Sequence, residues 1–145
     1  MDAENRYMDA QNRYMRVMVD TNILVSAILS STGRMHTLIC YIAAKYSLVL
    51  SSYVIDELLE VTRRKFKHKI DAVDTLLCQI PYELVYSPQS PQSGLFDIRD
   101  EKDYPVLYSA IASDVDVFIT GDKDFDEISV ERPEIITATM FWEKY

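Results

Sequence analysis

Four acidic residues stand where the chain is expected to leave a buried strand or to begin a helix: Asp20, Glu57, Asp103 and Asp122. Asp20 follows the apolar residues 17–19, and Asp122 follows the run DVFIT. Clustered carboxylates repel one another, so a folded protein holds them close only with positive charge between them. Hard divalent cations such as Mg2+ and Mn2+ are the usual partners of such oxygen clusters. The pattern therefore predicts a metal-dependent enzyme.

With Mg2+ or Mn2+ bound, such carboxylates can hold and deprotonate a water for in-line attack on a phosphodiester, and no protein nucleophile is needed. Asp124 is an alternative or additional metal ligand, or else the cap of a helix that begins near Phe125. Asn22 and Thr120 each lie two residues from one of the acids and are expected to orient ligands or substrate. For Asn22, a simple helix N-cap is an equal alternative.

A helix N-terminus offers another explanation for two of the acids. Glu57 falls in the first turns of an expected helix, and Asp103 caps or opens another. An acid there stabilises the helix by about 0.3 to 1 kcal/mol without any further role. For Asp103 taken alone this explanation stays open, whereas the four acids together favour a metal site.

Composition fits one globular domain. The chain has 145 residues, 48% hydrophobic and 26% charged, which are values typical of a soluble domain with one buried core. No apolar run approaches the ~20 residues that span a bilayer, and no secretory signal is visible, so we expect a cytoplasmic protein and no membrane. Cys40 and Cys78 lie in apolar helical stretches and are predicted to be small buried thiols.

The net charge of -8 argues against binding nucleic acid by charge alone. Cations would have to bridge to the phosphates, helped by a local basic patch. One run offers such a patch, and it is equally well explained as a solvated helix end: Arg63, Arg64, Lys65, Phe66, Lys67, His68 and Lys69.

The first fourteen residues are a tandem repeat, MDAENRY followed by MDAQNRY. They carry no core-forming pattern, so we interpret residues 1–14 as a repetitive, appended leader and residues 15–145 as the domain, with Met15 as the natural start. A short N-terminal helix is the alternative, because the repeat is rich in good helix formers.

From Arg16 onward strand and helix signals alternate, and Pro81 ends one of the helices. The strands are continuously apolar, which predicts a three-layer α/β/α fold with a central parallel sheet. Asp20 and Asp122 would face one crevice at the carboxyl ends of the strands, with Gly121 permitting a tight turn. We expect strands at 17–19, 47–51, 82–85, 115–120 and 135–136, and helices at 23–29, 35–45, 53–64 (capped by Ser52), 68–79 and 103–113, with a short terminal helix.

These residues resemble the PIN-domain nucleases. The resemblance lies in DTNILVSA from Asp20, ELLEV from Glu57, DEKDYPVLYSAI around Asp103 and ITGDKDF from Ile119 to Phe125. The motifs stand in family order, and the resemblance extends from residue 16 to the C-terminus. It is strongest to small VapC-like members that are the toxins of toxin-antitoxin pairs.

The resemblance implies a metal-dependent endoribonuclease whose Mg2+ or Mn2+ is bound by Asp20, Glu57, Asp103 and Asp122. It also implies an RNA substrate, a homodimer and an antitoxin that covers the acidic crevice. Tyr104 departs from the pattern, because many members carry another polar residue there. A PIN fold that only binds or scaffolds is the alternative, and the retention of all four acids argues against it.

Overall fold

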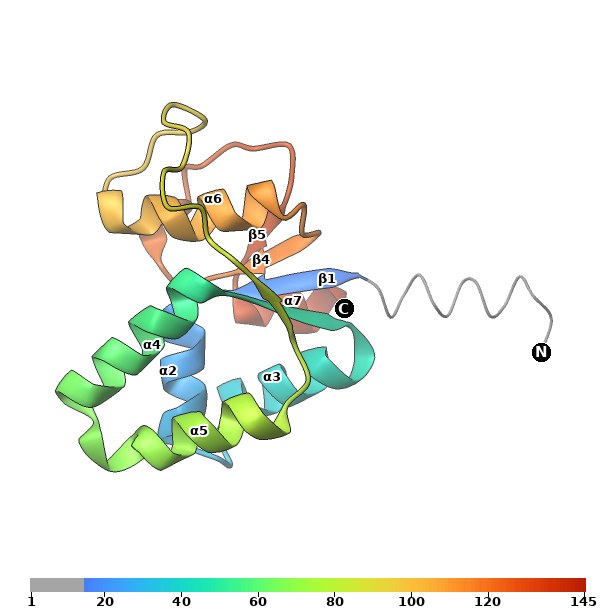
Figure 1. Cartoon of the computed structure of the whole chain (residues 1–145). Helices are drawn as coiled ribbons and strands as arrows, with labels where there is room; N and C mark the ends of the chain where they lie inside the picture. The colour runs from blue at the N-terminus through green and yellow to red at the C-terminus, as the bar shows by residue number, and fades with distance from the viewer. Residues whose placement is uncertain (1–14) are drawn as a thin grey trace.

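The computed structural model describes residues 15–145, so the interpretations of the repeat at residues 1–14 lie outside the described residues. Within the described part, five parallel strands form one sheet in the order β3-β2-β1-β4-β5 (Figure 1). The strands are β1 (Arg16–Val19), β2 (Ser47–Ser51), β3 (Glu83–Val85), β4 (Val117–Ile119) and β5 (Glu134–Ile136).

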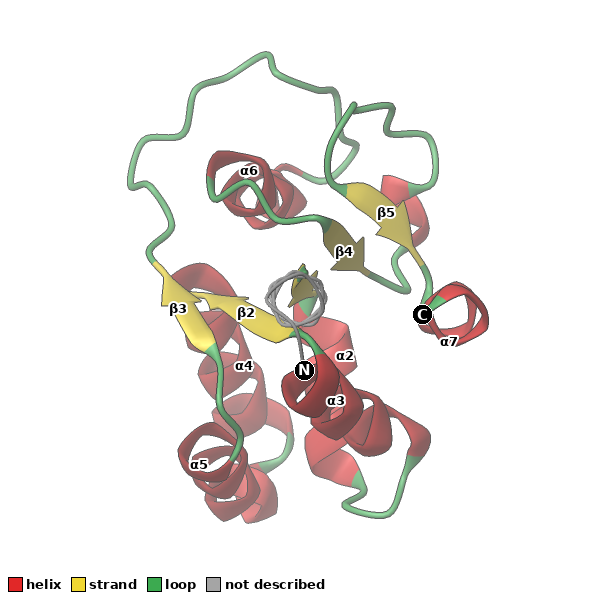
Figure 2. Ribbon diagram, turned by 90° about the vertical axis from the view of Figure 1, so that its right-hand side faces the viewer, coloured by secondary structure: helices red, strands yellow, loops and turns green. Residues whose placement is uncertain are grey.

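Helices cover both faces of this sheet. Figure 2 shows α6 on one face, and α2 to α5 with α7 on the other, so the predicted three-layer α/β/α fold is confirmed. The α-helices are α2 (Thr21–Leu29), α3 (Arg34–Lys45), α4 (Ser52–Lys65), α5 (Ile70–Gln79), α6 (Tyr104–Ala112) and α7 (Ala138–Lys144). Short 3-10 helices are η1 (Lys67–Lys69), η2 (Glu101–Asp103) and η3 (Lys123–Phe125).

The central strand β1 is buried on both of its faces. Val17, Met18 and Val19 are each 0% exposed, which explains why their run is continuously apolar. The two edge strands instead each carry a glutamate, Glu83 in β3 and Glu134 in β5. A charge on an edge strand discourages pairing with a further strand.

The strand order creates a switch point beside β1. β1 pairs with β2 on one side and with β4 on the other, in the registers Met18↔Val49 and Met18↔Phe118. The connections from β1 and β4 therefore leave the sheet in opposite directions, and open parallel sheets bind ligands at such a point. Asp20 and Asp122 follow these two strands.

Three expectations about local structure are wrong. Ser51, not Ser52, caps α4, because its Oγ accepts a hydrogen bond from the Val54 N–H at 3.2 Å. Gly121 does not have a positive φ, and a Cβ there would meet no atom within 4 Å, so its turn does not require glycine. The helix predicted at 68–79 begins as the separate 3-10 turn η1, and only Ile70–Gln79 is α-helical.

The prediction of buried thiols is also wrong, because Cys40 and Cys78 are both exposed. Cys78 lies two residues after the buried Leu76, which is about 200° around the helix and thus on its far side. The Sγ of Cys40 lies 3.8 Å from Nδ1 of His36, one turn earlier on the same helix.

No single helix among the described residues is long and apolar enough to cross a membrane. The pair α2 and α3 reaches the required length and composition only when the two are taken together across a bend of 114°.

Candidate functional site

Asp20 is fixed at the carboxyl end of β1 by three hydrogen bonds to other residues. Its N–H donates to the Ile119 carbonyl at 3.0 Å, which continues the pairing of β1 with β4. Its Oδ1 accepts from the Thr21 N–H at 2.7 Å and caps α2, and its Oδ2 accepts from the Thr120 hydroxyl at 2.8 Å. Asp20 is 5% exposed, so the carboxylate has these partners in place of bulk water.

Burial raises the pKa of Asp20 above its ordinary value. The hydrogen bonds from Thr120 and from the Thr21 N–H lower this pKa, whereas the negative charges of Glu57 and Asp122 raise it further. Two of the other predicted acids therefore lie close enough to Asp20 to influence its charge. A cation between them would reverse this effect and hold the carboxylate ionised.

Thr120 joins Asp20 to Asp122. Besides donating to Asp20, its hydroxyl accepts a hydrogen bond from the Asp122 N–H at 3.0 Å. Asp122 in turn caps η3, because its Oδ1 accepts from the Asp124 N–H at 2.9 Å. One threonine thus fixes the turn that carries two of the candidate ligands.

Asp103 lies at the start of α6, but its side chain does not cap the helix. Its Oδ2 is buried and has no hydrogen-bond partner among the described residues. Burial, followed by the charges of Asp122, Asp100, Asp20 and Asp124, raises the pKa of Asp103 to about 7. Asp103 therefore does not cap α6 through a side-chain hydrogen bond, and stabilisation of the helix start by its charge remains the alternative explanation.

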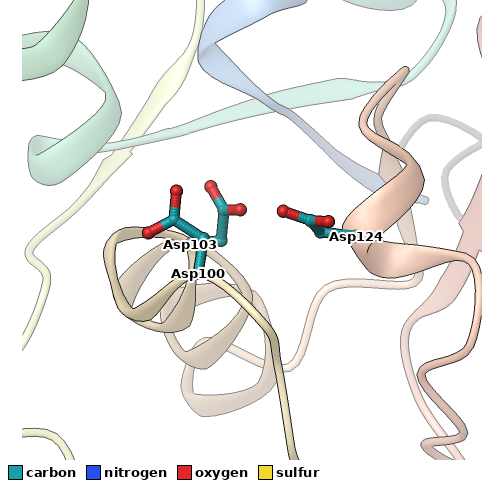
Figure 3. A group of neighbouring side chains, drawn as sticks. All are labelled: Asp100, Asp103 and Asp124. Carbon is teal, nitrogen blue, oxygen red and sulfur yellow. The ribbon is translucent and has the colours of Figure 1, made fainter.

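Asp100, Asp103 and Asp124 form the tightest acidic group in the described chain. Each offers one carboxylate oxygen, and these oxygens lie within 4.8 Å of one another. Figure 3 shows Asp124 pointing toward the other two from a separate segment. Arg99 lies at the rim, with its Nε 3.8 Å from Asp124 Oδ1.

Asp100 is the residue that sequence reasoning missed. Its Oδ1 accepts from the Lys102 N–H at 3.0 Å and caps η2, the turn that leads to Asp103. The signal was present in the motif DEKD, because two acids three residues apart lie on one face of a helical turn.

Glu57 reaches the group from α4. It is half-buried, and its charge raises the pKa of Asp20 and, after burial, that of Tyr53. The Tyr53 hydroxyl donates to the Lys102 carbonyl at 3.0 Å, which ties α4 to η2. Of the four predicted ligands, only Asp103 belongs to the close group with Asp100 and Asp124. The other three are linked to it through their charges, because Asp20 and Asp122 act on Asp103, and Glu57 acts on Asp20.

A serine network adds a second link between α4 and α6. Ser87 follows β3, and its N–H donates to Ser52 Oγ at 2.9 Å. The Ser87 hydroxyl accepts from the Tyr53 N–H at 3.3 Å and from the Ser109 hydroxyl at 2.8 Å. These bonds position the helices that carry Glu57 and Asp103.

The remaining predicted residues are exposed. Asn22 lies in the first turn of α2, and the alternative that it is the N-cap of this helix is wrong, because Asp20 is the N-cap. The basic residues of α4 and η1 are exposed at the far end of α4, about 10 Å along the axis from Glu57. Arg64 pairs with Glu60 at 2.9 Å. The predicted basic residues therefore do not form part of the acidic site. These residues are Arg63, Arg64, Lys65 and Lys67.

The donor set fits a hard divalent cation. All the candidate ligand atoms are carboxylate oxygens, which suit Mg2+ or Mn2+ and not a soft metal. The described chain has two buried side-chain oxygens without a partner, Asp103 Oδ2 and the hydroxyl of Thr21 beside Asp20. Asp103 Oδ2 belongs to the acidic group, so one buried polar atom that lacks a protein partner is found where a cation would supply one.

The fold is an open parallel sheet covered by helices, with acidic residues at its switch point. This places the chain in the class of three-layer α/β proteins, which bind ligands at the carboxyl ends of the strands beside the switch point. The sequence profile described as PIN domain matches residues 16–124. This match covers more than half of the chain, and the chain belongs to the PIN domain family.

Solved structures share the fold. The structure of VapBC2 from Rickettsia felis bound to a DNA fragment from their promoter aligns with a TM-score of 0.63 and 23% identity, over 84% of this chain and 97% of that chain. VapC20 of Mycobacterium tuberculosis, described as a toxin that cleaves the sarcin-ricin loop, aligns with a TM-score of 0.52 and 13% identity, over 81% and 99%. No curated protein matches in a sequence comparison.

Proposed function

We propose that this chain is a divalent-metal-dependent endoribonuclease. The observation that carries the proposal is the convergence of acids from separate segments around Asp103, whose buried Oδ2 has no partner within residues 15–145. In the proposed site, Asp20, Glu57, Asp103 and Asp122 hold Mg2+ or Mn2+, and Asp124 and Asp100 complete the rim.

Each part of the site has a distinct task in this proposal. A bound divalent cation supplies positive charge beside the scissile phosphate and a lower pKa for the attacking water. Asp20 is kept in place by Thr120 and the Thr21 N–H, whose hydrogen bonds favour its ionised form. Asp103 Oδ2 and the Glu57 carboxylate would help to hold the cation, and Glu57 would also accept the proton of the attacking water.

RNA would follow α4 away from the acids. The proposed phosphate contacts are the exposed side chains of Arg63, Arg64, Lys65 and Lys67 at the end of this helix. Because the chain has a net charge of -8, this local patch and the bound cation carry the attraction for RNA.

We further propose a cellular role as the toxin of a toxin-antitoxin pair. The fold it shares with VapBC2 and VapC20 supports this role, together with the resemblance of its motifs to VapC-like toxins. The corresponding partners are an antitoxin and a second copy of the chain in a homodimer, in the cytoplasm. Residues 15–145 are the nuclease domain in this proposal.

The test compares cleavage of single-stranded RNA by the wild-type protein and by Asp20→Asn. We expect cleavage with Mn2+ or Mg2+, loss of cleavage with chelator, and no cleavage by Asp20→Asn. If neither protein cleaves any RNA and both bind it equally, the chain is instead a PIN-fold binding or scaffold module.

A further inference from the structure

A cavity lies directly beside the acidic group. It has a volume of about 340 Å3, and it is formed where residues 86–100 meet η2 and the start of α6. Ligand pockets of proteins have volumes of about 300 to 1,000 Å3, so this one is of a size for one planar group and not for an extended ligand. Tyr104, which departs from the family pattern, lines it.

The apolar wall of the cavity is built from stacked rings and prolines. Phe96 stacks on Tyr104 with ring centroids 4.4 Å apart and planes 16° apart, and Tyr108 continues the stack at 5.9 Å. Pro91 and Pro105 also line the cavity. Such flat apolar carbon is the surface on which proteins pack unpaired bases.

The segment of residues 86–100 holds this apolar wall in place through hydrogen bonds to Tyr104. Its hydroxyl donates a hydrogen bond to the Gln92 carbonyl and accepts one from the Leu95 N–H at 3.4 Å. The ring therefore has a fixed position before any ligand arrives. A binding surface that is already ordered loses less conformational entropy when a ligand binds.

Two carboxylates complete the lining, those of Asp97 and Glu101. Both residues are exposed, and an ionised carboxylate only accepts hydrogen bonds. The matching ligand has N–H donors on one edge. Guanine presents two adjacent donors on its Watson–Crick edge, N1–H and N2–H, which pair with the two oxygens of one carboxylate.

We propose that this cavity is a subsite for an unpaired guanine of the RNA substrate. The inference rests on the proposed nuclease function for its biological meaning. Glu101 and Tyr104 lie within two residues of Asp103, so a base in the cavity brings its own phosphate to the acidic group. The subsite therefore selects which phosphodiester is presented for cleavage.

The binding experiment needs no turnover. The full chain labelled with 15N is titrated with guanosine, adenosine, cytidine and uridine in the presence of chelator. We expect guanosine to shift the amides of residues 91–105 and to bind most tightly. Glu101→Gln should weaken guanosine binding about tenfold, because a carboxylate that accepts two donors is lost. Glu101 is exposed, so this variant keeps the fold.

Matched controls separate the cavity from general effects. Glu143→Gln removes an exposed carboxylate on α7, and Tyr86→Ala removes a ring that is 82% exposed. Both should bind guanosine like the wild type. Tyr104→Leu should weaken guanosine binding about tenfold, because Phe96 loses the ring on which it stacks and Gln92 and Leu95 lose their hydrogen bonds to the hydroxyl.

The cleavage experiment uses oligoribonucleotides with one guanine in a uridine background and the same strand without guanine. We expect wild-type protein to cut the strand with guanine beside that base and faster than the guanine-free strand, and Glu101→Gln to lose this preference between the two strands. Cleavage without base preference, together with unshifted amides at residues 91–105, overturns the subsite and leaves the nuclease intact. Guanosine binding without any cleavage supports the cavity and counts against the nuclease.

Discussion

The hydroxyl of Thr120 holds Asp20 in place across 100 residues of sequence, donating to Oδ2 at 2.8 Å. Asp20 is 5% and Thr120 4% exposed, so water has little access to replace this bond. The same hydroxyl accepts from the Asp122 N–H at 3.0 Å. Thr120 therefore helps to position Asp20 and lowers its pKa against the opposing effect of burial.

Replacing Thr120 by Val should raise the pKa of Asp20, because the hydrogen bond that lowers it is lost while burial remains. Leaving a buried acceptor without its donor should also cost about 1 to 3 kcal/mol of unfolding free energy. Carboxyl 13C titration by NMR measures the pKa, and calorimetry should record weaker Mn2+ binding.

Thr120→Ser is the matched control, since it keeps the hydroxyl and removes only a methyl group. It should titrate and bind Mn2+ much like the wild type. Identical Asp20 titration in the Val and Ser variants would mean that Thr120 does not influence the charge of Asp20.

Asp103 should make the metal-free protein less stable as pH rises. The pKa of Asp103 is about 7 in the folded protein and 3.8 for an ordinary aspartate, which is the value taken for the unfolded chain. The folded state therefore binds the proton of Asp103 more tightly than the unfolded state does. This contribution is fully present below the unfolded pKa and is lost as pH rises through about 7. Thermal melts in chelator, from pH ~4 to ~8, should show a steeper decline for the wild type than for Asp103→Asn.

Asp74→Asn is the control for this pH effect, because Asp74 is exposed on α5. Its melting temperature should follow the wild-type decline. The assignment of the pH dependence to Asp103 would be contradicted if the melting temperature of Asp103→Asn fell with pH as steeply as that of the wild type. Marked unfolding of Asp103→Asn at every pH would also contradict it.

The sheet and most helices could be predicted from the sequence because their signals are local. Residues 17–19 and 47–51 are continuously apolar, and β1 and β2 occupy almost the same ranges. The order of the strands could not be predicted in this way. It depends on the pairing of Val17 with Val117, which no local pattern encodes.

The site could be predicted in part. Asp20 and Asp122 were placed correctly at strand ends, because parallel topology puts those ends at one edge. Asp100 was not predicted as a site residue, because its closeness to Asp124 depends on how residues 86–100 fold back onto α6. The prediction of buried thiols was wrong for a related reason. An apolar stretch does not show which side of its helix is buried, and Cys78 lies on the side opposite the buried Leu76.

Adding Mn2+ should raise the melting temperature, since a ligand that binds only the folded state stabilises it. At a hundred times the dissociation constant the gain is about 2.7 kcal/mol. Chelator should abolish activity without unfolding the protein, because the core is extensive without any metal. A collapse of the fold in chelator, followed by circular dichroism, would show that the cation is structural.

Asp100→Asn tests whether the missed acid takes part in this binding. It should reduce the Mn2+-induced rise in melting temperature, because one of three oxygens within 4.8 Å loses its charge. Asp74→Asn again serves as the exposed control, and it should respond to Mn2+ like the wild type. An equal Mn2+ response in both variants would exclude Asp100 from the site.

The basic end of α4 should contribute to RNA binding through its charge. Arg63 and Lys67 are exposed, and no ion pair involving either is found within residues 15–145. Each phosphate contact on single-stranded RNA contributes about 0.7 to the slope of log K against log salt. Replacing both residues by Ala, in an Asp20→Asn background that leaves RNA uncut, should therefore reduce the slope by about 1.4. Arg34→Ala, at an exposed position on α3, is the control. An unchanged slope in the double variant would assign this basic run to helix solvation alone, because salt dependence reports the counterions that bound phosphates release.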